Sequence, residues 1–251
     1  MVNLPNDKNR ILRLAMWSGP RNISTAMMRS WGNRADTVVV DEPLYAFYLK
    51  ATGKKHPVAQ EVIAHGEMDW RKVVAELTES GHKGPSHIFY QKQMTHHLLP
   101  EIGLDWLAGL TNCFLIRDPA EVIASYVRKN DDPALEDLGF VQQAGIFDWV
   151  RVQSGGVPPV IDARDVLQDP EGMLRLLCRA VGVEFDPAML SWPPGLRETD
   201  GVWAKHWYGE VAKSTGFAPY REKPVEVPEH LREVEARCRE CYDRLSQHRL
   251  R

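Results

Sequence analysis

The sequence of 251 residues has few cysteines, little excess charge of either sign and no long apolar segment. No apolar run approaches the roughly 18 residues that a membrane-spanning helix needs, and the polar start of the chain does not look like a signal peptide. Four cysteines suit a reducing compartment. A net charge of -3 excludes a global attraction to nucleic acid. We therefore expect a cytoplasmic protein without a membrane or nucleic-acid partner.

The first loop of the chain lacks the lysine of a nucleotide-kinase loop. An apolar strand over residues 12–18 leads into Gly19, and a helix opens near Ser24 and Thr25. Such a turn directs backbone N–H groups and the positive end of a helix dipole to one point, where a phosphate or sulfate can bind. In the pattern G-x-x-x-x-G-K-[ST], Thr25 replaces the lysine and Ala26 the magnesium-binding hydroxyl. The loop predicts an anion site that is not an ordinary ATP site; the alternative is that its hydroxyls only cap the helix.

Apolar or β-branched runs alternate with helical patterns along most of the chain. This alternation favours an α/β fold, with a mostly parallel sheet of about five strands flanked by helices in a three-layer domain over residues 1–251. The expected strands cover residues 12–18, 37–40, 87–91, 112–116 and 159–162, and the expected helices include residues 22–31, 134–154, 172–181 and 228–247.

Two segments have weaker patterns. Residues 44–86 are polar and irregular apart from one helix capped by Asp69. Residues 192–224 are rich in Trp, Gly and Pro and are expected to form an ordered loop. Because ligands bind at the carboxyl ends of the strands in open parallel sheets, these two segments are the candidates for an acceptor site or a lid.

An arginine and a serine follow the fourth expected strand. Arg117 stands at the strand end, and Ser125 comes eight residues later, about two helical turns on. Both can reach one anion above the helix, the guanidinium through charge-assisted hydrogen bonds. The alternative is an arginine paired with Asp118 or Glu121 and a serine that only packs.

Together these two stretches resemble the sulfotransferase family, which uses the sulfate donor PAPS (3′-phosphoadenosine 5′-phosphosulfate). Residues 20–25 (PRNIST) are similar to the family loop P-[KR]-x-G-[ST]-[ST], with Ile23 where glycine is usual. Residues 117–125 match the family motif R-[DN]-P-x-x-x-x-x-S, and residues 160–171 loosely resemble a third family segment. The resemblance covers about residues 11–193. A β-branched residue at position 23 is unfavourable if the loop needs a positive φ there.

The resemblance implies a P-loop NTPase-like fold, PAPS as the donor and no metal. It places the 5′-phosphosulfate on the first loop and the 3′-phosphate on the Arg117 motif, with a late basic segment closing over the nucleotide. The donor-binding residues that it implies are Gly19, Pro20, Arg21, Asn22, Ser24, Thr25, Arg117, Ser125 and Lys213.

The second expected strand ends in Asp41-Glu42-Pro43, which supplies a candidate base. The proline is expected to hold Glu42 in an extended conformation, pointing out of the sheet edge. The resemblance implies that a Glu or a His takes the proton of the acceptor. The alternative is that Asp41 or Glu42 caps a helix or pairs with Arg21.

A lysine and two histidines follow the third expected strand and start a probable helix. Lys92 is expected to reach the sulfuryl group or the acceptor, and His97 competes with Glu42 as the base. Adjacent histidines on a helix point in different directions, so at most one of His96 and His97 is expected to face the site. The expected catalytic set is Glu42, Arg21, Lys92 and His97.

The motifs and the resemblance predict a sulfotransferase that moves a sulfuryl group from PAPS to a hydroxyl or amine of a small-molecule acceptor. A small-molecule kinase of the same fold is one alternative, which the missing loop lysine disfavours. A catalytically inactive nucleotide-binding module is another, and Ile23 is its main support. The acceptor and the oligomeric state stay open.

Overall fold

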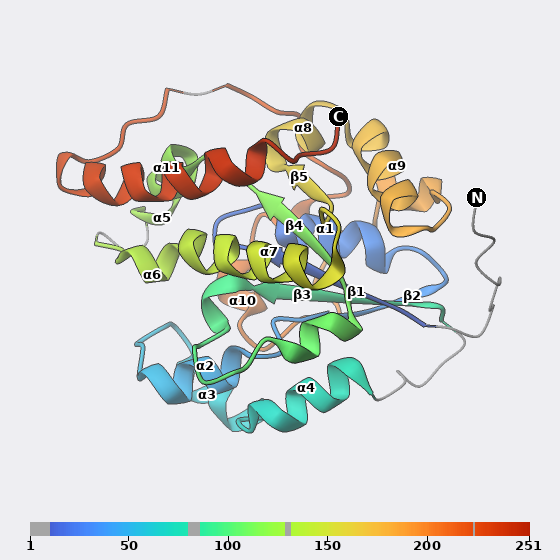
Figure 1. Ribbon diagram of the computed structural model, residues 1–251, viewed down its shortest axis with the longest axis horizontal. Coiled ribbons are helices and arrows are strands. Elements are labelled where there is room, and N and C mark those ends of the chain that lie inside the picture. The colour runs from blue at the N-terminus through green and yellow to red at the C-terminus, as the bar shows by residue number, and fades with distance from the viewer. Residues whose placement is uncertain (1–10, 80–85, 129–131, 223) are drawn as a thin grey trace.

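The centre of the molecule is a sheet of five parallel strands in the order β2-β3-β1-β4-β5 (Figure 1). The computed structural model describes residues 11–79, 86–128, 132–222 and 224–251. The strands are β1 (Leu12–Ser18), β2 (Thr37–Asp41), β3 (Ile88–Met94), β4 (Thr111–Ile116) and β5 (Val160–Asp162). The predicted α/β fold with a parallel five-stranded sheet is therefore confirmed.

Strand β1 lies in the middle of the sheet, and both of its faces are buried. Leu14 and Met16 pack into the core on one face, whereas Ala15 and Trp17 pack into the core on the other. Parallel strands read as continuous apolar runs because helices cover both faces of the sheet. This is why the strand was recognisable from sequence alone.

Helices cover the sheet in two layers (Figure 1). One layer contains α1 (Ser24–Gly32), α2 (Tyr45–Thr52) and α9 (Pro170–Val181). The other contains α4 (Trp70–Thr78), α7 (Phe140–Ser154) and α11 (Arg232–Ser246), and α7 and α11 run side by side although they are far apart in sequence. The remaining helices are α3 (Ala59–His65), α5 (Pro119–Tyr126), α6 (Leu135–Leu138), α8 (Ala163–Gln168) and α10 (Ala204–Trp207).

Three expectations about the elements were wrong. The helix expected over residues 134–154 is broken at Gly139, whose φ of 72° is a conformation that glycine adopts without strain. Residues 44–86, expected to be irregular apart from one helix, also contain α2 and α3. Lys92 lies inside β3 rather than after it, and only a short 3-10 helix, Thr95–His97, follows.

Other local expectations hold. The Asp69 side chain caps α4 by accepting a hydrogen bond from the N–H of Arg71. No helix in the described part of the chain is long and apolar enough to cross a membrane. The first ten residues, where the sequence argues against a signal peptide, lie outside the described residues.

Candidate active site

A cavity of about 660 Å³ opens at the carboxyl ends of β1, β2 and β3. Parallel strands place their ligand sites at this edge, so its position agrees with the fold. The lining residues come from the first loop, the end of β2, the segment around α2 and α3, the end of β3 and the region of α10. They are Pro20, Arg21, Asn22, Ser24, Thr25, Glu42, Tyr45, Lys55, His56, Pro57, Lys92, Met94, His96, His97, Tyr126, His206, Trp207 and Tyr208.

The first loop presents an uncapped helix end to this cavity. Ile23 is the N-cap residue of α1, and no side chain caps the helix; the first turn also contains no acidic residue. The alternative interpretation, in which Ser24 and Thr25 only cap the helix, is therefore wrong. The first N–H groups of a helix have no partner within it, so they are available to an anion.

The unusual residue of the loop does not carry the strained conformation. Ile23 has a φ of -85°, whereas Arg21 has a φ of 54°. The objection to a β-branched residue at position 23 therefore does not apply to this loop. Gly19 is needed for another reason, since a Cβ atom there would lie 2.7 Å from the carbonyl oxygen of Leu138. The loop thus packs directly against the backbone of α6.

The structure brings Arg21, Arg117 and Ser125 together beside the loop. Arg21 Nε donates to Ser125 Oγ over 3.0 Å, and Arg117 Nη1 donates to the carbonyl oxygen of Arg21 over 2.7 Å. Burial lowers the pKa of Arg21, and the nearby charges of Arg117 and Arg128 lower it further. No carboxylate pairs with Arg21 among the described residues. Positive charge accumulates here without full compensation.

Arg117 also forms the ion pair that the alternative interpretation expected. Its Nε and Nη2 both lie 2.9 Å from Glu121 Oε2, while Asp118 is paired instead with Arg239. Arg117 and Ser125 do not line the cavity described above. Their assignment to a 3′-phosphate stays a prediction, in which Glu121 would share Arg117 with the anion.

Glu42 lies at the cavity wall, held by a buried lysine. Lys92 Nζ is 2.5 Å from Glu42 Oε1 and 2.9 Å from Asp41 Oδ1. Glu42 has a φ of 45°, so the expectation of an extended backbone before Pro43 was wrong. The alternative, in which Asp41 or Glu42 pairs with Arg21, is not seen among the described residues, because both carboxylates bind Lys92. The side chain of Glu42 keeps an exposure of 12% and lines the cavity.

The cluster around Glu42 contains two carboxylates and one ammonium. Burial raises the pKa of Glu42 above its ordinary value; the Lys92 charge opposes this shift, and the Asp41 charge adds to it. Burial alone would lower the pKa of Lys92, but the carboxylates of Asp41 and Glu42 raise it well above its ordinary value. Lys92 is therefore a fixed cation, and Glu42 is a carboxylate with an enhanced affinity for a proton.

Both adjacent histidines line the cavity, so the expectation that only one would face it was wrong. A 3-10 helix is tighter than an α-helix, and the two imidazoles lie with centroids 4.3 Å apart. Burial lowers the pKa of His96 to about 3 and holds that of His97 well below its ordinary value. Neutral imidazoles with so low a pKa accept a proton poorly, which favours Glu42 over His97 as the base.

The chain matches the family described as "Sulfotransferase domain" over residues 12–234. It belongs to the sulfotransferase family. The match covers the first loop, the Arg117 motif and the late segment, residues 192–224. The predicted membership is confirmed, and with it the P-loop-like arrangement of the fold.

Two curated plant proteins are similar in sequence to most of this chain. The chain is 37% identical over 84% of its length to branched-chain-amino-acid aminotransferase-like protein 1 of Arabidopsis thaliana, and 33% identical over 92% of its length to branched-chain-amino-acid aminotransferase-like protein 2 of the same plant. It spans only 38% and 41% of the length of these relatives.

Solved structures of the same fold include a sulfotransferase from Alicyclobacillus acidocaldarius, with a TM-score of 0.55 and 12% identity over 95% of this chain and 97% of that one. The sulfotransferase domain from the curacin biosynthetic pathway has a TM-score of 0.51 and 16% identity over 94% of this chain and 98% of that one.

The late segment differs from what the sequence predicted. Lys213 is exposed at the end of a 3-10 helix and does not line the cavity, so its donor-binding role stays a prediction. Tyr208 instead reaches the cluster at Glu42, with its hydroxyl 2.7 Å from Lys92 Nζ. Sequence reasoning missed Tyr208, as well as Tyr45 and His56 in the cavity wall. No motif marks these three residues, because only the tertiary fold brings them to the strand ends.

Proposed function

We propose that this sulfotransferase takes the sulfuryl group of PAPS and transfers it to a hydroxyl or amine of a small-molecule acceptor. One observation carries the proposal. The uncapped end of α1, the guanidinium of Arg21 and the carboxylate of Glu42 all line one cavity, and no carboxylate of the described residues pairs with Arg21. An anion site and a base with a raised pKa are the two parts that sulfuryl transfer to a hydroxyl needs.

The residues around the first loop suit a donor with several anionic groups. Ser24, Thr25 and the N–H groups of α1 would hold the phosphosulfate. Arg21 would stabilise the negative charge that develops on the bridging oxygen as the sulfuryl group leaves. Arg117 and Ser125 both contact Arg21, and they would hold a second phosphate. When bound, the donor supplies the activated sulfuryl group.

Glu42 would accept the proton of the acceptor hydroxyl at its carboxylate. Its backbone is fixed by a hydrogen bond from its own N–H to the carbonyl oxygen of Lys92 over 3.0 Å, and its carboxylate is fixed by Lys92 Nζ. A base whose position and rotamer are both held loses little entropy on reaction. The raised pKa of Glu42 brings its proton affinity closer to neutral pH.

The charges of the cavity favour a hydroxyl over an amine. Its lining contains the cations of Arg21, Lys55 and Lys92, whereas Glu42 is the only carboxylate among the described residues that line it. With Asp41, which pairs with Lys92 behind Glu42, the three cations still outnumber the two carboxylates. The neutral imidazoles of His96 and His97 add no charge. A protonated amine would enter a region of net positive charge, whereas a neutral or acidic hydroxyl compound would not. Acidic hydroxyl compounds are the acceptors to screen first.

The test is sulfuryl transfer from PAPS to a pooled acceptor extract, with and without EDTA, beside an ATP control. P-loop kinases hold a magnesium ion through the hydroxyl after the loop lysine, and that place is occupied by Ala26. We expect sulfation that is insensitive to EDTA and no ATP turnover. Magnesium-dependent ATP consumption would instead favour the kinase alternative.

The variant Glu42→Gln separates an active enzyme from an inactive binding module. It keeps the shape of the side chain and removes the proton acceptor, so turnover should fall by roughly 10²–10⁴-fold while binding of PAP, the desulfated donor, persists. Binding is measured by calorimetry. If turnover persists in Glu42→Gln but is lost in His97→Ala, the base is His97 and not Glu42.

A further inference from the structure

Every N–H bond of the Lys92 ammonium is used within the protein. Its Nζ lies 2.5 Å from Glu42 Oε1, 2.7 Å from Tyr208 Oη and 2.9 Å from Asp41 Oδ1. An ammonium has three donors, and these are three acceptors. Lys92 is fully buried, with a side-chain exposure of 1%. It therefore has no donor left for a sulfuryl group or an acceptor, in contrast to the expectation from sequence.

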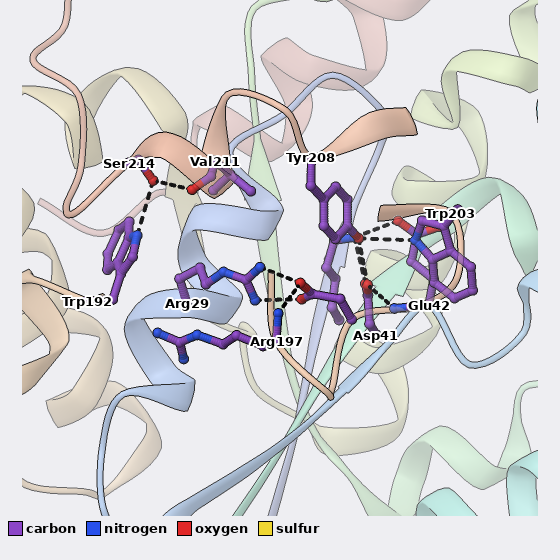
Figure 2. A network of polar contacts seen from close by, with 12 residues as sticks. Arg29, Asp41, Glu42, Trp192, Arg197, Trp203, Tyr208, Val211 and Ser214 are labelled. Carbon is purple, nitrogen blue, oxygen red and sulfur yellow. Dashed lines mark hydrogen bonds and ion pairs between the residues drawn. The ribbon is translucent and has the colours of Figure 1, made fainter. Parts of the chain in front are cut away.

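The hydroxyl of Tyr208 is equally occupied. It accepts hydrogen bonds from Lys92 Nζ and, over 3.2 Å, from Trp203 Nε1, and it donates to the carboxylate of Asp41 at 2.7 Å (Figure 2). A phenol has one donor and two acceptor positions, so nothing is left over. Buried polar networks whose members are all satisfied are rigid.

The late segment reaches this cluster at a second point. The N–H of Gly201 donates to Asp41 Oδ2 over 3.3 Å. The preceding residue, Asp200, forms a doubly hydrogen-bonded ion pair with Arg29 of α1, and both side chains are almost completely buried. The segment that carries Tyr208 is thus fastened to α1 and to the end of β2.

We propose that Asp41 and Tyr208 are positioning residues that hold Lys92 so that its third N–H fixes the catalytic carboxylate of Glu42. The late segment would then fix the position of the Glu42 carboxylate, although its Tyr208 hydroxyl and Gly201 N–H are bonded within the cluster and do not contact the acceptor. The inference rests on the proposed role of Glu42 in sulfuryl transfer. It assigns to Lys92 an indirect role, through Glu42.

The two positioning residues act on Glu42 in opposite directions. The groups that face Glu42 are Asp41 from β2, Lys92 from β3, Tyr208 after α10 and Tyr45 from α2. The Asp41 charge raises the pKa of Glu42, whereas the Lys92 ammonium, which Tyr208 holds beside Glu42 Oε1, lowers it. Asp41→Asn should therefore lower the pKa of Glu42, and Tyr208→Phe should raise it.

The experiment follows the Glu42 carboxyl by ¹³C NMR in selectively labelled protein without donor, with Glu42→Gln to assign the signal. We expect its titration to move by about one pH unit, downward in Asp41→Asn and upward in Tyr208→Phe. The matched control is Tyr242→Phe, which removes a tyrosine hydroxyl that donates to another carboxylate, Asp162 Oδ2, over 2.7 Å. It should leave the Glu42 titration where it is. Thermal unfolding of each variant establishes that it is folded.

The pH dependence of kcat/KM is measured on the same proteins. Its acidic limb should move in the same directions as the NMR titration, while calorimetric PAP affinity stays within a factor of about two of the parent. Titrations that do not move, or that move in the same direction in both variants, overturn the positioning role. If the NMR titrations move in opposite directions but the acidic limb does not follow, the positioning role holds and Glu42 is not the base.

Discussion

At the residue scale, Arg117 makes two kinds of contact whose consequences differ. Its Nη1 supports the carbonyl oxygen of Arg21, whose φ of 54° is unusual for a non-glycine residue, and its remaining nitrogens pair with Glu121. The first contact is structural support for the loop. The second leaves a guanidinium that an incoming phosphate can share, since the pair is about a quarter exposed.

We predict that Arg117→Ala weakens PAP binding by roughly two orders of magnitude, the equivalent of about 2–4 kcal/mol for a charge-assisted contact. Affinity for adenosine 5′-phosphosulfate, which lacks the 3′-phosphate, should hardly change. Calorimetry with both ligands measures the difference, and Glu121→Gln, which keeps the guanidinium, is the control. Equal losses for the two ligands would mean that Arg117 acts only through the loop.

At the scale of elements, the strands were predictable and the turns that orient the site were not. Buried parallel strands such as β1 and β4 are continuous apolar runs, and their ends were located from sequence within one or two residues. The left-handed conformations of Arg21 and Glu42 leave no local signal, because neither residue is a glycine or an asparagine. Helix α2 was missed because its aromatic residues face both the cavity and the core rather than forming one apolar stripe.

The fastening of the late segment to α1 gives a prediction at this scale. Arg29 and Asp200 have side-chain exposures of 1% and 3%, so Asp200→Asn leaves a buried guanidinium without its counter-charge. We expect a loss of about 3–5 kcal/mol in the free energy of unfolding, measured in urea. Glu171→Gln, which breaks the exposed pair with Arg175, should change stability by less than about 1 kcal/mol. Similar losses in the two variants would show that the late segment is not held by this ion pair.

At the scale of the whole molecule, the buried imidazoles make stability depend on pH. His96 and His97 are neutral in the folded protein, with pKa values lowered by burial, to about 3 for His96. The unfolded chain binds protons on these residues near their ordinary pKa of about 6.5. The unfolded state therefore binds more protons between the two values. Stability from this source is complete above about pH 6.5 and is lost as the pH falls toward the folded-state pKa.

We predict that the free energy of unfolding falls by about 1.4 kcal/mol per pH unit for each of these histidines once the pH is well below 6.5. His96→Gln should reduce the slope of stability against pH between pH 6 and pH 4.5, as measured by urea unfolding. His65→Gln, at an exposed histidine, serves as the control. An unchanged slope in His96→Gln would mean that this imidazole is already protonated in the folded protein.

Three non-glycine residues in the described part of the chain have a positive φ: Arg21, Glu42 and Val58. The first two line the cavity, and the third follows its lining residue Pro57. A left-handed conformation costs an L-residue about 1–2 kcal/mol, which glycine avoids. Laboratory evolution toward a higher melting temperature should therefore repeatedly select Gly or Asn at these positions. The most heat-stable variants would then lose the side chains of Arg21 and Glu42 and have the lowest activity. Selection for heat resistance alone would therefore remove functional side chains from the cavity.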